Sequence, residues 1–195
     1  LDGNVWHPVL KQGIVEYGIR NRAIAEIAET LINSGFFPLI LLSQIKHGQQ
    51  VLETLEKAGI KTLFARGGNK ILTSNGIISG SINDAYGMIK NGAAQIMIAT
   101  QIGDEGVDLP DVDALILATG GKGDKVTTQR MFRPLTASAE KQHAMVIDFD
   151  DRQHNVLRRQ SAARRKIYKT LGFAPKLKFL PEVKDAIKAK SRVSS

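Results

Sequence analysis

Short runs of apolar residues recur along the chain and alternate with segments of helical periodicity. Each run is continuous rather than alternating with polar residues, so both faces of each predicted strand should be covered. This pattern is typical of a parallel sheet flanked by helices. The predicted strands are Pro38 to Leu42, Thr62 to Ala65, Ile96 to Ala99, Ala114 to Ala118 and Ala144 to Phe149.

The segments between these strands have helical patterns. From Ile24 onward, apolar residues follow the spacing i, i+3, i+4, i+7 and i+8, and a second apolar stripe covers residues 51–55. A third helix is predicted to begin at Ser81, which forms a capping box with Asp84. Glycines end these helices, at Gly35, Gly59 and Gly92. Such alternation of strands and helices predicts right-handed βαβ units and an open α/β sheet.

Residues 67–80 fit neither pattern, and we expect a loop there. After Asp151 a helix is predicted, and beyond it Pro175 and Pro181 should interrupt regular structure and leave residues 184–195 frayed. The apolar stripe of this helix is Val156, Leu157, Ala163, Ile167 and Leu171. Its remaining surface should display Arg158, Arg159, Arg164, Arg165 and Lys166.

A chain of 195 residues that is 43% apolar can bury one good core. We therefore predict one domain over residues 1–151, followed by a basic C-terminal helix and tail over residues 152–195. Neither a membrane-spanning run nor a signal sequence is evident, which favours a soluble cytoplasmic protein without a membrane partner. No cysteines are present, and the four histidines lack the spacing of a metal site, so we expect surface or capping histidines and no bound metal.

The net charge of +8 is distributed unevenly. Residues 1–151 contain 14 Lys and Arg against 17 Asp and Glu, whereas residues 152–195 contain 13 against 2. Such a basic block is expected of an element that binds a polyanion, although a solvated tail would have the same composition.

The segment Ile96 to Thr136 carries the most specific chemistry. Its first strand ends at Thr100, and a turn through Gly106 and Asp108 leads to the next strand. A hydroxyl and exposed backbone amides suit phosphate oxygens, and a carboxylate suits ribose hydroxyls. The alternative is that this segment is a turn that only connects two strands and binds no ligand.

A second group, Gln129, Arg130 and Arg133, follows about ten residues after that next strand. Arginine suits a site of phosphate transfer because its planar, permanently charged guanidinium can bridge phosphate oxygens as negative charge builds up. A purely structural arginine at the start of a helix is the alternative.

Together these groups resemble motifs V and VI of the second RecA-like domain of superfamily 2 helicases and translocases, and the likeness is greatest to phage and bacterial DNA translocases. It covers roughly residues 14–170, with Leu39 to Ser43 similar to motif IV and Leu63 to Gly68, including Arg66, similar to motif IVa. The resemblance implies that Gly106 and Asp108 bind ATP, that Gln129, Arg130 and Arg133 are catalytic, and that Thr100, Gln101 and Arg66 contact nucleic acid. We assign the basic residues Arg159, Arg164, Arg165 and Lys166 to nucleic-acid binding as well.

Two positions depart from motif VI. Phe132 stands where the family has glycine, and Thr136 stands where it has a second arginine finger. These substitutions put strong hydrolysis in question. Gly120, Gly121 and Gly123 precede Lys125 without forming a P-loop, and they instead predict a flexible turn. Asp104 and Glu105 suit motif V better than a magnesium site.

We therefore predict the C-terminal motor domain of an ATP-dependent nucleic-acid helicase or translocase, with DNA the favoured substrate. ATP and Mg²⁺ would be held mainly by an N-terminal RecA-like domain of the same polypeptide, so this fragment alone should be inactive. One alternative is a non-catalytic nucleic-acid-binding module with a degenerate motif VI. Another is an unrelated doubly wound enzyme for a small phosphorylated substrate, which tight nucleotide binding by the isolated chain would favour.

Overall fold

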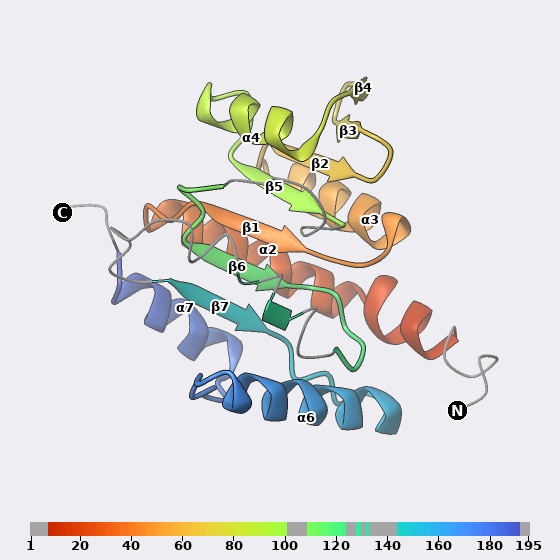
Figure 1. Cartoon of the computed structure of the whole chain (residues 1–195), viewed down its shortest axis with the longest axis vertical. Helices are drawn as coiled ribbons and strands as arrows, with labels where there is room; N and C mark the ends of the chain where they lie inside the picture. The colour runs from red at the N-terminus through yellow and green to blue at the C-terminus, as the bar shows by residue number, and fades with distance from the viewer. Residues whose placement is uncertain (1–7, 101–108, 124–127, 130–131, 133–143, 192–195) are drawn as a thin grey trace.

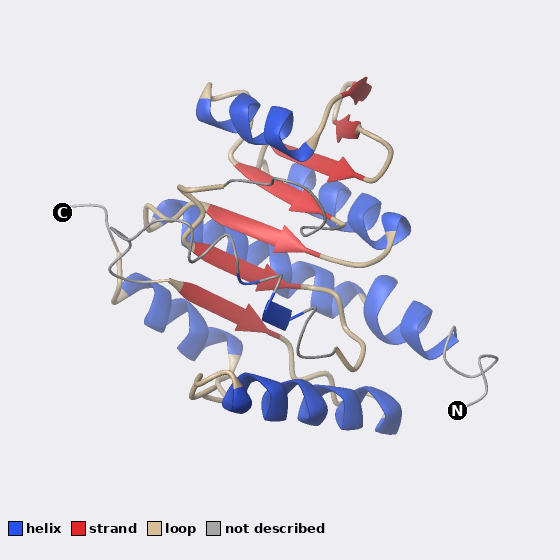
Figure 2. Cartoon of the chain, in the orientation of Figure 1, coloured by secondary structure: helices blue, strands red, loops and turns tan. Residues whose placement is uncertain are grey.

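A computed structural model describes residues 8–100, 109–123, 128–129, 132 and 144–191. A seven-stranded sheet lies at its centre, with helices on both faces (Figures 1 and 2). The strands are β1 (Pro38–Leu41), β2 (Thr62–Arg66), β3 (Lys70–Thr73), β4 (Gly76–Ser79), β5 (Ile96–Ala99), β6 (Ala114–Leu117) and β7 (Met145–Asp148). The helices are a short π-helix, η1 (Lys11–Val15), and the α-helices α2 (Gly18–Asn33), α3 (Ile45–Lys57), α4 (Ile82–Lys90), α6 (Asn155–Thr170) and α7 (Leu180–Lys188).

The strand order is β4-β3-β2-β5-β1-β6-β7, and the five strands from β2 to β7 in this order are parallel. All five coincide with the apolar runs in the sequence, which confirms the predicted open α/β sheet. Every residue of β1, β5 and β6 is buried. Helices cover each of these strands on both sides, so every position of the strand faces a core, and this explains why the strand sequences are continuously apolar.

Alternate side chains of each strand enter two separate cores. Ile40 packs on one face with residues of α2, α3 and α7, whereas its neighbour Leu39 packs on the opposite face with α4 and α6. Tyr86 of α4 and Tyr168 of α6 belong to this second core. The sheet therefore forms the middle layer of three, as the predicted fold requires.

The residues predicted to begin and end the helices are confirmed. Ser81 accepts a hydrogen bond from the Asp84 backbone N–H, and the Asp84 carboxylate accepts one from the Ser81 backbone N–H at 2.7 Å. The glycines expected to end three of the helices, Gly35, Gly59 and Gly92, all have positive φ.

The prediction of a loop over residues 67–80 is wrong. Strands β3 and β4 form an antiparallel hairpin there, and β3 pairs antiparallel with β2. Ile71 and Leu72 are buried, while Ile77 and Ile78 of the outer strand are exposed. Two apolar pairs on either side of the turn at 74–75 were the available sign of a hairpin.

The C-terminal region is also more ordered than predicted. Pro181 lies in the first turn of α7, where its missing N–H removes no helical hydrogen bond. The Glu182 carboxylate accepts a hydrogen bond from the Phe179 backbone N–H at 2.7 Å, and Ile187 is fully buried against the first core. Residues 184–191 therefore belong to the packed structure rather than to a frayed tail. The proposed division at residue 151 remains a prediction.

None of the helices in the described ranges is long and apolar enough to cross a membrane.

Candidate functional site

Two of the predicted nucleic-acid-binding residues, Arg66 and Thr100, lie at the carboxyl edge of the sheet. Strands β2 and β5 are parallel, with Ala65 paired to Ala99, so the residues that follow, Arg66 and Thr100, lie at the same edge. Both are half-buried. The Arg66 Nε atom is buried and has no hydrogen-bond partner among the described residues. This edge thus places an arginine and a hydroxyl side by side, both suited to a phosphate backbone.

The edge continues across β1 and β6. The Leu42 backbone N–H donates to the Ala99 carbonyl at 3.1 Å, which extends the strand pairing to the end of β1. The next residue, Ser43, donates its hydroxyl proton to the Thr119 carbonyl at 3.4 Å. The segment resembling motif IV is therefore joined to the loop that follows β6.

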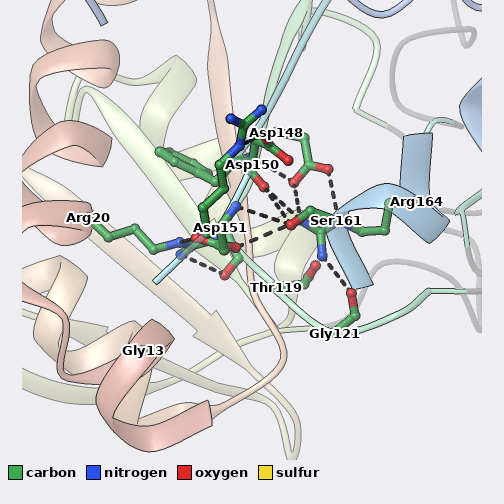
Figure 3. A network of polar contacts seen from close by, with 12 residues as sticks. Gly13, Arg20, Thr119, Gly121, Asp148, Asp150, Asp151, Ser161 and Arg164 are labelled. Atoms are coloured by element: carbon green, nitrogen blue, oxygen red, sulfur yellow. Dashed lines mark hydrogen bonds and ion pairs between the residues drawn. The ribbon is translucent and has the colours of Figure 1, made fainter. Parts of the chain in front are cut away.

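Two buried arginines hold this loop. Arg20 of α2 donates from Nη1 to the Ala118 carbonyl at 3.2 Å, and Arg164 of α6 donates from Nη1 to the Gly121 carbonyl at 2.5 Å (Figure 3). Gly120 and Gly121 have φ values of 64° and 77°, a left-handed conformation that favours glycine. The two guanidinium groups thus hold residues 118–121, the first part of the turn predicted to be flexible.

Arg20 forms a buried ion pair with Asp151, which follows β7. Its Nε lies 2.9 Å from Asp151 Oδ1, and the two side chains are only 2% and 5% exposed. The guanidinium also stacks over the Phe149 ring, 4.4 Å from its centroid. Burial lowers the pKa of Arg20 and raises the pKa of Asp151, so desolvation opposes both charges. Their mutual contact is the main compensation, and Arg164 Nη2, 3.8 Å from Asp151 Oδ2, adds a second positive charge.

Asp148, the last residue of β7, is the centre of a second group. Its carboxylate accepts from Arg164 Nε at 2.8 Å and from the Tyr168 hydroxyl at 2.8 Å. Arg164 Nη2 also donates to the Phe149 carbonyl at 2.8 Å. Figure 3 shows Arg164 of α6 between Asp148 at the end of β7 and Gly121 in the loop after β6.

The prediction that Arg164 lies on the exposed face of α6 is therefore wrong. Its side chain is buried, because the inward-facing line of α6 contains polar as well as apolar residues: Leu157, Ser161, Arg164 and Tyr168. Burial tends to lower the pKa of Arg164, but the adjacent Asp148 carboxylate raises it overall, so the group stays charged. Arg164 is engaged within the fold and does not contribute to an exposed basic surface.

The outer face of α6 is basic. Arg159 and Lys166 are exposed as predicted, together with Arg158 and Lys169. Arg165 is partly exposed and forms an ion pair with Asp150. The cations available to an external partner are therefore a subset of those predicted.

The histidines His47 and His154 differ in burial and in what they contact. His154 caps α6, its Nδ1 accepting from the Val156 backbone N–H at 3.1 Å, as expected of a capping residue. The expectation is wrong for His47, which is buried, with its Nε2 3.0 Å from Asn21 Oδ1. Burial, and then the nearby charge of Arg20, lower the pKa of His47 to about 3, so it is neutral at physiological pH.

Most residues of the segments that resemble motifs V and VI lie outside the described ranges. Gln101, Gly106, Asp108, Arg130 and Arg133 lie outside the described residues. Gln129 is exposed and helical, whereas Phe132 is helical and only 6% exposed. Within the described ranges, no group of three or more metal-binding side chains is found.

Arg20, Asp148 and Asp151 were not singled out from the sequence. The three aspartates at 148, 150 and 151 lie at the end of a predicted strand and directly after it, where polar residues meet the carboxyl edge of a sheet. That position was the available sign of the network, but the arginines that pair with them come from distant parts of the chain.

Solved structures of helicases have the same fold. The chain aligns with the C-terminal domain of the DEAD-box protein Dbp5 at a TM-score of 0.57 and 15% identity, covering 85% of this chain and 91% of that domain. It aligns with T4 UvsW at a TM-score of 0.57 and 17% identity, covering 77% of this chain and 32% of UvsW. A structure of S. cerevisiae Dbp5 bound to RNA and ADP BeF3 aligns at a TM-score of 0.59 and 14% identity, covering 87% of this chain and 42% of that one.

A viral protein shares sequence with part of the chain. "Putative helicase 22" of Sulfolobus islandicus filamentous virus (isolate Iceland/Hveragerdi) is 28% identical over 88 residues, a match that spans 40% of this chain and 16% of the viral protein. No family model matches the chain. The fold is that of the RecA-like C-terminal domains of superfamily 2 helicases.

Proposed function

We propose that this chain is the C-terminal motor domain of an ATP-dependent nucleic-acid helicase or translocase. The observation that carries the proposal is the carboxyl edge of the sheet, where Arg66 and Thr100 lie together at the ends of adjacent strands. In the sequence these residues belong to segments that resemble motifs IVa and V. The fold shared with helicase C-terminal domains supports the same assignment.

In this proposal nucleic acid runs along that edge. The side chain of Arg66 and the hydroxyl of Thr100 would contact phosphate oxygens, with Gln101 beside them in the chain. Such contacts position a strand without reading its sequence. DNA is our favoured substrate, and RNA is the first alternative to test, because one of the aligned structures is Dbp5 bound to RNA.

ATP would bind between this domain and an N-terminal RecA-like domain of the same polypeptide. Asp108 would face the ribose, with Gly106 beside it in the ATP-binding segment. Arg133, with Gln129 and Arg130, would face the transferred phosphate. Mg²⁺ would be held by the N-terminal domain together with the nucleotide. Bound ATP supplies the free energy for closure of the two domains, which would move the strand.

A non-catalytic nucleic-acid-binding module is the second candidate. Phe132 is buried in this structure at the position where the resembling family has glycine, so motif VI departs from the family at a packed residue. This candidate would be favoured if the complete protein binds nucleic acid in a salt-dependent manner but does not hydrolyse ATP.

The exposed face of α6 leads to a testable prediction on nucleic-acid binding. Replacing Arg159 and Lys166 by glutamine should flatten the plot of log affinity against log salt by about two units on duplex DNA, because each lost phosphate contact removes close to one. Affinity should fall similarly for unrelated sequences. The measurement is fluorescence anisotropy at several salt concentrations, with DNA and RNA duplexes and single strands.

The matched control is the pair Lys57→Gln and Lys61→Gln, which removes the same charge from exposed positions at the end of α3 and directly before β2. Its salt slope should equal that of the unmodified protein. If the α6 variant also keeps the original slope on every substrate, the basic helix is a solvated surface and takes no part in binding.

A further inference from the structure

An aromatic cluster joins the motif VI segment to the C-terminal helix. The ring of Phe132 packs against Tyr168, with centroids 5.9 Å apart, and meets Phe173 edge-on at 5.0 Å and 83°. Phe132 is 6% exposed and Tyr168 is 7% exposed. Both belong to the core on the α4 and α6 side of the sheet. The bulky residue that replaces glycine in motif VI is therefore an anchored side chain.

The partner of Phe132 is itself fixed. The Tyr168 hydroxyl donates to Asp148 at 2.8 Å, and the same carboxylate accepts from Arg164 Nε at 2.8 Å. Burial raises the pKa of the Tyr168 hydroxyl, so it remains a donor at neutral pH. The ring that supports Phe132 is thus tied to the end of β7 and cannot shift without breaking buried polar contacts.

The same helix also holds the approach to motif VI. Arg164, one turn before Tyr168, donates to the Gly121 carbonyl in the loop after β6. A Cβ at Gly123 would lie 3.6 Å from Arg164 Cγ and 3.8 Å from the Thr128 hydroxyl oxygen, and Thr128 is buried. Contacts from α6 therefore fall on both sides of Gln129, at the loop before it and at Phe132 after it.

This arrangement matters for catalysis because of chain connectivity. Arg133 follows Phe132 directly, and consecutive Cα atoms are about 3.8 Å apart, so fixing Phe132 limits where the Arg133 backbone can lie. Groups that stabilise a transition state must be held close to their productive geometry, and their support comes from packed neighbours.

We propose that Phe132, Tyr168 and Arg164 are positioning residues for ATP hydrolysis, through which α6 holds the motif VI segment in its catalytic position. This proposal rests on the proposed motor function. It gives the C-terminal helix two faces with separate tasks: an exposed basic face toward nucleic acid and a buried aromatic and polar face toward motif VI.

The test uses the complete protein with Phe132→Ala, and measures kcat and KM for ATP in the presence of nucleic acid. We expect kcat to fall roughly 10²-fold, the loss typical of a small misplacement of catalytic groups, while KM for ATP changes less than about threefold. Phe132→Met, which refills the space beside both rings, should recover most of kcat. Phe179→Ala is the matched control, because this phenylalanine is 82% exposed and follows the same helix.

Thermal melting by circular dichroism shows whether each variant is folded. Should Phe132→Ala fail to fold, Phe173→Ala removes the edge-on contact from a ring that is 46% exposed, and kcat should still fall several-fold at constant KM. A folded Phe132→Ala or Phe173→Ala protein with unchanged kcat overturns the positioning role. Absence of ATP hydrolysis in the unmodified complete protein would instead contradict the motor function itself, so the two failures are distinguishable.

Discussion

Replacing Arg133 by alanine in the complete protein is expected to lower the rate of ATP hydrolysis by about 10³-fold or more, with ATP binding largely retained. An arginine finger acts on charge that develops in the transition state, so its loss affects turnover far more than ground-state affinity. Steady-state hydrolysis and the binding of a non-hydrolysable ATP analogue measure the two effects separately.

Arg133→Lys tests the geometry of the same interaction. Lysine keeps the charge but loses the planar fork that bridges two oxygens, so we expect only partial recovery of turnover. Arg22→Ala, at an exposed position of α2, is the control for removal of one arginine and should be neutral. A loss of less than about tenfold for Arg133→Ala would make this arginine structural and the motif VI assignment wrong.

The second large effect concerns stability. Arg20→Met should lower the free energy of unfolding by about 3–5 kcal/mol, because the buried Asp151 carboxylate loses its hydrogen-bonded partner and keeps only the more distant Arg164, 3.8 Å away. The substitution also removes the hydrogen bond to the Ala118 carbonyl and the stacking on Phe149. Urea denaturation of the 195-residue chain, followed by circular dichroism, gives this value.

A surface ion pair provides the comparison. Lys184 lies 3.1 Å from Glu26, and the two side chains are 33% and 47% exposed, so Lys184→Met should cost less than about 1 kcal/mol. Adding Asp151→Leu to Arg20→Met should recover much of the lost stability, since no isolated buried charge then remains. If Arg20→Met costs no more than Lys184→Met, the buried pair does not hold the end of β7 as described.

The central part of the fold was predictable because its physical signals are local. A buried parallel strand needs an unbroken apolar run, and all five such runs became strands of the sheet. The Ser81 capping box likewise depends on residues three apart in the sequence. Signals that act over a few residues can be read from one sequence without knowledge of what packs against them.

The errors arose where a local signal has two meanings. Pro181 predicts an interruption, yet proline in the first turn of a helix is compatible with helical structure, and Pro181 is the second residue of α7. The segment 67–80 is rich in glycine and polar residues, which suggested a loop, while its short apolar pairs form a hairpin. Only the neighbouring strand β2 and the cover of α4 decide between these outcomes.

The candidate site depended on contacts between distant residues. Arg164 is expected to be exposed because charged residues usually are. In the fold, Asp148, which lies 16 residues earlier, and the Gly121 carbonyl accept its hydrogen bonds and so offset the cost of burying its charge. The pairing of Arg20 with Asp151 spans 131 residues. No periodicity in the sequence indicates that two residues so far apart form an ion pair. The positions of Arg66 and Thr100 at strand ends, in contrast, follow from the strand prediction itself.

ATP hydrolysis by the complete protein and by the isolated 195-residue chain tests the central proposal most directly. Both should be measured with and without single-stranded and duplex DNA and RNA. The account predicts turnover by the complete protein that nucleic acid stimulates, and no turnover by the isolated chain, because it supplies only one side of the ATP site. Steady hydrolysis by the isolated chain, with or without nucleic acid, would contradict the assignment of this domain as half of a shared site.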